Sequence, residues 1–204
     1  MTETQDSTDG AQRIADVAAR LFARDGFKGV SMATLAREAG VSKAAIFHHY
    51  PSKEALYYSV LKAACEETTR FLRGLDEGEE RSDEALARFA QHQIQNLFQH
   101  ADVNQLVLRE LLDAESERVR TMAEEVHGEN FHRLVGLIRS GQEAGMFDEA
   151  YDPAVVAVTL IGAQVFFFLA REGLGHMPAV GFADDAEAFS GSLVQLLLNG
   201  LRPR

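Results

Sequence analysis

The chain has 204 residues, of which 46% are hydrophobic and only four are proline, so it can bury a substantial core and leaves little room for long disordered regions. Its single cysteine excludes an intramolecular disulfide framework and suits a reducing compartment. No basic and then apolar leader opens the sequence, so we expect a cytoplasmic protein, and the net charge of −11 argues against nucleic acid as a partner of the chain as a whole.

Positive charge is nevertheless concentrated in the first quarter of the chain. Residues 11–56 hold seven Lys or Arg and four Asp or Glu, a net charge of +3, whereas residues 57–204 carry −11 and residues 1–10 carry −3. Only residues 11–56 are therefore electrostatically suited to a polyanion, and two copies side by side would suit DNA better. Residues 1–10 are polar and acidic without periodicity, which predicts a disordered tail.

Three short helices are predicted in this positively charged segment. The first covers about residues 11–25 and ends at Gly26. Ser31 can cap the second helix, Gly40 can adopt the left-handed conformation that closes it, and Ser42 can cap the third. Two short helices joined by such a tight turn form a helix-turn-helix, in which the later helix lies in the major groove of DNA. The apolar stripe of the first helix consists of Ile14, Val17, Ala18, Leu21 and Phe22.

The third predicted helix carries residue types that suit contact with DNA. Free N–H groups at its start favour a phosphate near Lys43, and the small Ala44 and Ala45 allow close approach to base edges. Lys53 brings a further positive charge to the start of the next helix. The alternative is a plain helical hairpin with a solvated lysine and two surface histidines. The candidate DNA-binding residues are Ser31, Thr34, Ser42, Lys43, Ala44, Ala45, Phe47, His48, His49, Tyr50 and Lys53.

Residues 11–61 resemble the amino-terminal domain of the TetR/AcrR (tetracycline-repressor-like) family. The resemblance is carried by the stretches 14–27, 31–53 and 54–56, which include an Ala-Gly-Val-Ser turn and a Phe-His-His-Tyr-Pro-Ser-Lys exit. It implies an all-α fold with a three-helix, helix-turn-helix DNA-binding domain and a larger carboxy-terminal helical domain for ligand binding and dimerisation. The expected division is a disordered tail over 1–10, the DNA-binding domain over 11–56 and the larger domain over 57–204.

The sequence departs from the family pattern at three positions of the third helix. Family members often carry Gly where Ala44 stands, and Tyr-Tyr or Tyr-Trp where Phe47 and His48 stand. Phe47 lacks the hydroxyl that contacts a phosphate in relatives. His48 could supply an aromatic contact and would bind phosphate better when protonated.

Helices are next predicted over about 52–75, from Ser82 onward, over about 103–114 and over about 116–143. Cys65 is interpreted as a buried small side chain rather than a redox sensor. Gln93 and His100 are polar groups on an apolar face, so they either find partners in the core or meet a ligand. No spacing of His or Cys indicates a metal site, and no cofactor is expected. The candidate ligand-binding residues are Phe89, Gln93, Leu97, Phe98, His100, Phe131, Leu134, Ile138, Gln164 and Phe167.

A second, less specific resemblance to the same family covers residues 136–147 and 152–153, at the turn before the last two helices. Gly145 is expected to end one helix, Asp152 to cap the next, and Pro153 to occupy its first position. The last helix is predicted over about 184–199.

Residues 153–170 are almost wholly apolar, and three interpretations compete. The segment could span a membrane, although it is shorter than the usual ~20 residues and contains Gln164. It could be buried within one subunit. It could also place one face on its own domain and the other against a partner subunit, which a shared four-helix bundle with the final helix favours. The candidate interface residues are Val155, Thr159, Gly162, Phe166, Phe189, Ser192, Leu193 and Leu196.

The sequence therefore favours a ligand-responsive repressor that binds operator DNA as a homodimer and is released by a small apolar or amphipathic molecule. An all-helical enzyme is a weaker alternative, because no nucleophile–base pair, phosphate loop or metal motif is present. The second weaker alternative is a helical protein-interaction module that does not bind DNA.

Overall fold

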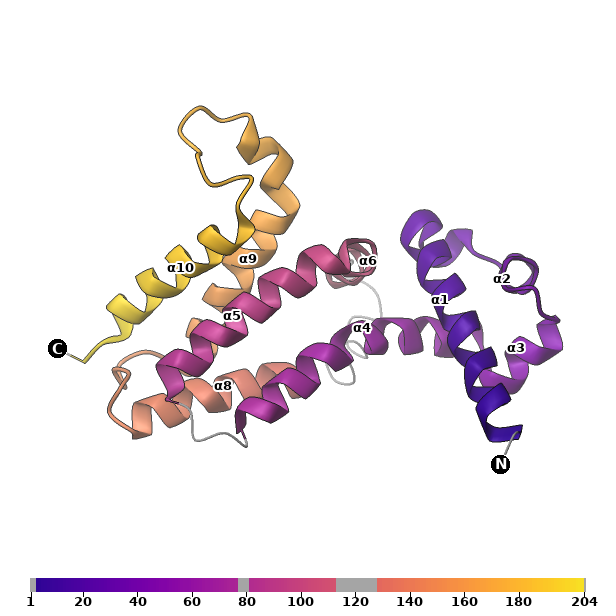
Figure 1. Cartoon of the computed structure of the whole chain (residues 1–204), viewed down its shortest axis with the longest axis horizontal. Helices are drawn as coiled ribbons and strands as arrows, with labels where there is room; N and C mark the ends of the chain where they lie inside the picture. The colour runs from indigo at the N-terminus through magenta and orange to yellow at the C-terminus, as the bar shows by residue number, and fades with distance from the viewer. Residues whose placement is uncertain (1–2, 77–80, 113–127, 204) are drawn as a thin grey trace. The chain divides into compact units, whose positions relative to one another are not determined.

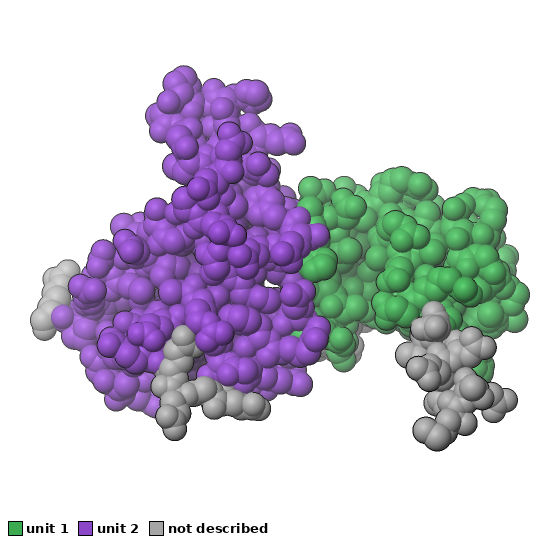
Figure 2. All heavy atoms as spheres, viewed as in Figure 1, with its two compact units in different colours: residues 1–66, 100–127 green, residues 67–99, 128–204 purple. Residues whose placement is uncertain are grey.

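The computed structural model describes residues 3–76, 81–112 and 128–203, and these residues form helices and turns without a strand, which confirms the all-α prediction (Figure 1). The described chain divides into two compact units (Figure 2). The first unit takes its residues from 1–66 and 100–127, and the second from 67–99 and 128–204. The helices are α1 (Glu3–Gly29), α2 (Met32–Ala39), α3 (Lys43–His49), α4 (Lys53–Asp76), α5 (Ser82–Gln99), α6 (Ala101–Leu112), α8 (Gly128–Glu143), α9 (Pro153–Gly175) and α10 (Ala186–Leu201).

The first unit is built around α1, which packs against α2, α3 and α6. Its core includes fully buried side chains from four of its helices, among them Phe22, Leu35, Ile46 and Tyr57. The first half of α4 belongs to this unit, because Leu56, Tyr57, Val60 and Leu61 are all buried in the same core. The unit boundary in α4 consequently lies after the domain boundary that the sequence predicts at residue 56.

Helix α1 begins at Glu3, whereas the sequence predicts a disordered tail over residues 1–10 and a helix from about residue 11. The acidic composition of this stretch is compatible with a helix, because negative charge is favourable near a helix amino terminus. The predicted end at Gly26 corresponds to a kink, since Gly26 has φ 70° and ψ 171° while helical residues continue on both sides. Phe27 then turns its ring toward Phe22, with 6.1 Å between ring centroids.

The second unit is built around α5, which packs against α8, α9 and α10. Its core contains Leu86, Leu134, Ile138 and Leu160, each with no exposed side-chain surface. The apolar sides of these helices therefore face one another, and their burial supplies the main stabilisation of this unit.

The turn between α8 and α9 has the predicted caps. Gly145 has φ 70°, and the N–H of Met146 donates to the Gly141 carbonyl at 2.9 Å. The Asp152 carboxylate accepts from the N–H of Ala154 at 2.8 Å, and Pro153 begins α9.

Gly141 itself lies where α8 meets this turn, and a Cβ at that position would collide with the ring of Phe147 and lie 3.0 Å from Cβ of Ser82. The ring of Phe147 is 3% exposed. Because Gly141 has no side chain, the ring of Phe147 can enter the core.

Several predicted helix limits need correction. The predicted stop of the last helix at Asn199-Gly200 is wrong, because α10 continues to Leu201, whose side chain is 4% exposed. The Leu201 carbonyl also accepts from the N–H of Asp148 at 2.7 Å, so burial and a hydrogen bond outweigh the weak helix propensity of Asn and Gly. Helix α9 runs beyond the predicted residue 170 to Gly175. Of the helix predicted over 116–143, the part before residue 128 lies outside the described residues.

Candidate nucleic-acid interface

The helix-turn-helix predicted in the first unit is present with its expected caps. The Ser31 hydroxyl accepts from the N–H of Thr34, and the Ser42 hydroxyl accepts from the N–H of Ala45, both at 3.1 Å. Gly40 closes α2 in the left-handed conformation at φ 65° and ψ 33°. Residues that have a Cβ adopt this backbone conformation only at a cost in free energy. These local contacts set the turn between α2 and α3.

Helix α3 is anchored on one face and open on the other. Ile46 has no exposed surface and fixes the helix against the core of the first unit. Lys43, Ala44, Phe47 and His48 are exposed on the remaining surface, and Phe47 keeps 48% of its surface in solvent. An exposed face that combines a cation, a small side chain and aromatic rings is suited to a nucleic-acid groove. Ser31 and Ser42 are also exposed, and Ala45 and Thr34 are half-buried.

Two of the candidate DNA contacts have partners inside the first unit. The Tyr50 hydroxyl donates to the Ala11 carbonyl at 3.2 Å and joins the end of α3 to α1. The Lys53 ammonium donates to the carbonyls of Phe27 and Val30, each at 2.8 Å. His49 is half-buried beside Tyr50. The residues of α3 that remain directed to solvent are therefore the sharper candidates for contact with DNA.

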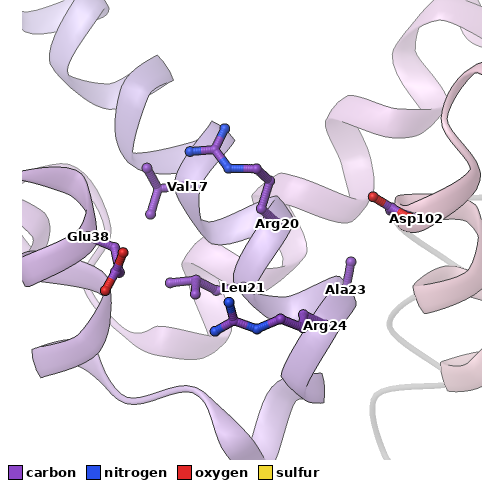
Figure 3. A pocket seen from close by; sticks show the side chains of 7 residues that line it. All are labelled: Val17, Arg20, Leu21, Ala23, Arg24, Glu38 and Asp102. Carbon is purple, nitrogen blue, oxygen red and sulfur yellow. The ribbon is translucent and has the colours of Figure 1, made fainter.

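A hollow of about 500 Å³ on the first unit was not predicted (Figure 3). Its charged side chains are Arg20 and Arg24 from α1, Glu38 from α2 and Asp102 from α6, with Val17, Leu21 and Ala23 as its apolar lining. Arg24 makes two 2.8 Å hydrogen bonds to Asp25, and these bonds lower the pKa of that carboxyl. The two cations and two anions of its lining carry no net formal charge. The spacing of Arg20 and Arg24 by one helical turn is the signal that could have drawn attention to it.

The candidate ligand residues lie mostly in the core of the second unit. Phe89, Leu97, Leu134, Ile138, Gln164 and Phe167 are buried, and Gln93, Phe98 and Phe131 are half-buried. His100 is exposed and belongs to the first unit, so the structure does not group it with the others.

Gln164 makes hydrogen bonds inside the core of the second unit. Its amide nitrogen donates to the Ala90 carbonyl and to the Ser190 hydroxyl, both at 2.8 Å, and that hydroxyl donates to Ala90 at 3.1 Å. These bonds join α5, α9 and α10 within the core. The Gln164 carbonyl oxygen is buried without a hydrogen-bond partner among the described residues.

His92 is a half-buried polar residue of α5 that the list of candidate ligand residues does not contain. Its ring stacks on Phe71 with a centroid separation of 4.1 Å and an interplanar angle of 2°. Partial burial lowers the pKa of His92, and the nearby Glu67 opposes that shift. The position of His92 three residues after Phe89, on the same face of α5, was the available signal.

Helix α9 presents one face to its own core and another to solvent. Val156, Leu160 and Phe167 are buried. Val155 and Phe166 on the predicted partner face are 61% and 63% exposed. Thr159 and Gly162 are exposed beside them, and the unpredicted Val158 and Leu169 extend the same surface.

Helix α10 contributes unevenly to that apolar surface. Leu196 is 71% exposed and Ser192 is exposed, whereas Leu193 is half-buried. Phe189 is half-buried and stacks on Phe167 at 4.3 Å, so much of its ring contributes to the core.

By length and composition α9 could also cross a membrane, but core helices of soluble proteins pass the same test. An apolar face of this size generally marks an interaction surface.

Comparisons with known proteins agree with this architecture. Residues 14–60 match the family model of bacterial regulatory proteins of the tetR family. The HTH-type transcriptional regulator AcrR of Shigella flexneri is 36% identical over 56 residues, which cover 28% of this chain and 26% of that protein. The chain spans at most 39% of the length of such curated relatives.

Solved structures extend the likeness to the whole fold. PfmR of Thermus thermophilus, a TetR family transcriptional regulator, aligns with a TM-score of 0.69 and 25% identity, covering 94% of this chain and 100% of that chain. FadR of Bacillus subtilis, solved in complex with stearoyl-CoA, aligns with a TM-score of 0.73 and covers 94% and 99% of the two chains. Its 19% identity shows a shared fold alone. The predicted resemblance to the TetR/AcrR family is confirmed.

Proposed function

Because this chain belongs, by its helix-turn-helix domain, to the TetR family, we propose that it is a ligand-responsive transcriptional regulator that binds operator DNA as a homodimer in the cytoplasm. The observation that carries the proposal is the exposed face of α3, where Lys43, Ala44, Phe47 and His48 stand opposite the buried anchor Ile46. Such a face is available to a major groove without rearrangement of the first unit.

On DNA, the contacts divide into two kinds. The amino terminus of α3 and the Lys43 ammonium bind phosphate, and they position the domain without reading sequence. Ala44, Phe47 and His48 follow along the exposed face and meet base edges or sugar. The net charge of +3 over residues 11–56 is modest, so two domains acting together are needed for tight binding.

Dimerisation uses the apolar surface of α9 and α10 that the second unit leaves uncovered. Val155, Phe166 and Leu196 would be covered by the same residues of a partner in a twofold four-helix bundle. Thr159 fits such a surface, because its hydroxyl already donates to the Val155 carbonyl at 2.8 Å and needs no partner across the interface. The dimer places two α3 helices about one turn of DNA apart, ~34 Å, over a near-palindromic operator.

The effector we propose has a long apolar chain and a polar head, and it binds within the second unit. The largely apolar set around Phe89, Leu134 and Ile138 suits the chain, while Gln93 and His92 on α5 can meet the head. The stearoyl-CoA held by the FadR structure supports this ligand class. Binding favours a dimer geometry with the wrong half-site spacing and releases DNA, with a coupling of about 1–3 kcal/mol per site.

An electrophoretic mobility shift titration tests the DNA proposal. The probe is a duplex fragment from upstream of the protein's own gene, and affinity is measured across a range of salt concentrations. Lys43→Ala should weaken binding and flatten the salt dependence, while Lys62→Ala, an exposed lysine on α4 with the same charge change, should leave both unchanged. An absence of DNA affinity at every salt concentration would remove the proposal.

The effector proposal has its own assay. Stearoyl-CoA should raise the thermal stability of the protein and weaken its binding to DNA, whereas free CoA should do neither. The all-helical enzyme and the protein-interaction module are weaker alternatives, because the named relatives are transcriptional regulators.

A further inference from the structure

We propose that Lys53 is a positioning residue that locks the start of α4 to the connection between α1 and α2, rather than a contact to the DNA backbone. This inference rests on the proposed function only for its DNA-binding arm. Its structural arm concerns the first unit alone and can be tested without DNA.

The charge of Lys53 is already engaged by backbone acceptors. Its ammonium donates to the carbonyl of Phe27 and to the carbonyl of Val30, each at 2.8 Å. These carbonyls belong to the last turn of α1 and to the residue that follows it. Carbonyls at the end of a helix carry partial negative charge and lack helical partners, so a cation there is strongly favoured.

An aromatic ring lies beneath the same ammonium. The Nζ atom of Lys53 is 4.1 Å from the ring centroid of Phe27, which is a cation–π contact. The Phe27 ring in turn meets Tyr57 edge to face at 4.9 Å, and Tyr57 meets Phe22 at the same distance. Tyr57 has no exposed surface and lies one helical turn after Lys53 on the same face of α4.

These contacts connect three parts of the first unit at one point. Lys53 is the first residue of α4, its acceptors lie between α1 and α2, and Tyr57 reaches the core beside Phe22. These contacts fix the start of α4 relative to the end of α1 within the first unit. The two carbonyls and the ring leave one N–H of the half-buried ammonium for any other acceptor.

The experiment compares Lys53→Met, Lys53→Arg and Lys43→Met in the full-length protein. Scanning calorimetry without DNA measures Tm, and titration of the upstream duplex at several salt concentrations measures the salt slope. Lys53→Met should lower Tm by about 5 °C or more and leave the slope unchanged. Lys43→Met should leave Tm unchanged and reduce the slope by about 0.9 per subunit, since it removes one phosphate contact.

Lys53→Arg separates the charge from the geometry. A planar guanidinium cannot place a compact cation over the Phe27 ring and both carbonyls, so Tm should fall although the charge is kept. Should Lys53→Met fail to fold, Lys53→Arg still decides the structural arm through its Tm, and Lys53→Gln takes the place of Lys53→Met in the salt titration. A wild-type Tm in both Lys53 variants, or a reduced salt slope in the variant that folds without the charge, would overturn the inference. If the wild-type protein binds no DNA, the proposed function fails, while the calorimetry still decides the role of Lys53.

Discussion

Replacing Phe166 by Asp should convert the protein from a dimer into a folded monomer. Phe166 lies on α9 with 63% of its surface exposed, within the apolar face proposed to meet a partner. Full burial of such a side chain is worth about 2 kcal/mol, so covering the exposed part contributes about 1.3 kcal/mol per subunit. A twofold interface doubles that loss to about 2.6 kcal/mol.

The introduced carboxylates add a larger penalty. Each would be removed from water opposite apolar side chains, at a cost of several kcal/mol. The total exceeds about 6 kcal/mol, which corresponds to more than a ~10⁴-fold weaker dimer. Because the residue is exposed in the single chain, the subunit should keep its helical content.

Light scattering coupled to gel filtration and analytical ultracentrifugation measure the outcome, with circular dichroism as the test of folding. The matched control is Phe47→Asp, which makes the same change at an exposed phenylalanine of α3. It should stay dimeric and lose DNA affinity. A Phe166→Asp protein that remains dimeric at micromolar concentration would refute the assignment of this face to a partner subunit.

Gly40→Ala should destabilise the protein by about 1–2 kcal/mol, because φ 65° is unfavourable for a residue with a Cβ; urea titration measures the change, and an unchanged midpoint would contradict it. Burial raises the pKa of Cys65 to about 11, from an ordinary value of 9.0, so its thiol should react slowly with a disulfide reagent at pH 8 and quickly once urea unfolds the chain. Between pH 9.0 and about 11 the unfolded thiol ionises and the native thiol does not, so the free energy of unfolding should fall as pH rises through that window. Equal labelling rates in native and unfolded protein would exclude a buried thiol. Ser190→Ala removes one acceptor of the buried Gln164 amide and should cost about 1–3 kcal/mol in urea titration, with Ser192→Ala on the exposed side of α10 as the neutral control.

Features that depend on neighbouring residues were predictable from the sequence. Ser31 and Ser42 cap helices through contacts three residues away, and Gly40 closes a helix because of its own backbone freedom. Such signals are contained in a few consecutive letters, and they were sufficient for the helix-turn-helix.

Features that depend on distant residues were not predictable in this way. Lys53 carries the same charge as a phosphate contact, and only the fold brings it to carbonyls that lie 23 and 26 positions earlier in the chain. His100 shares a helical stripe with Gln93 but lies in a different unit. The end of α10 was misplaced because burial of Leu201 outweighs the local preference of Gly200.

The closely packed glycine of α8 has a consequence for how this chain can diverge. A methyl group at position 141 would collide with the ring of Phe147, whereas a methyl group at Gly136 on the same helix would meet no described atom within 4 Å beyond the neighbouring backbone of its own helix. A library of substitutions should thus tolerate alanine at 136 and reject every residue at 141. The turn from α8 into α9 depends on the absence of a Cβ at Gly141, because the ring of Phe147 occupies that space. We therefore expect this turn to be one of the least mutable places in the second unit.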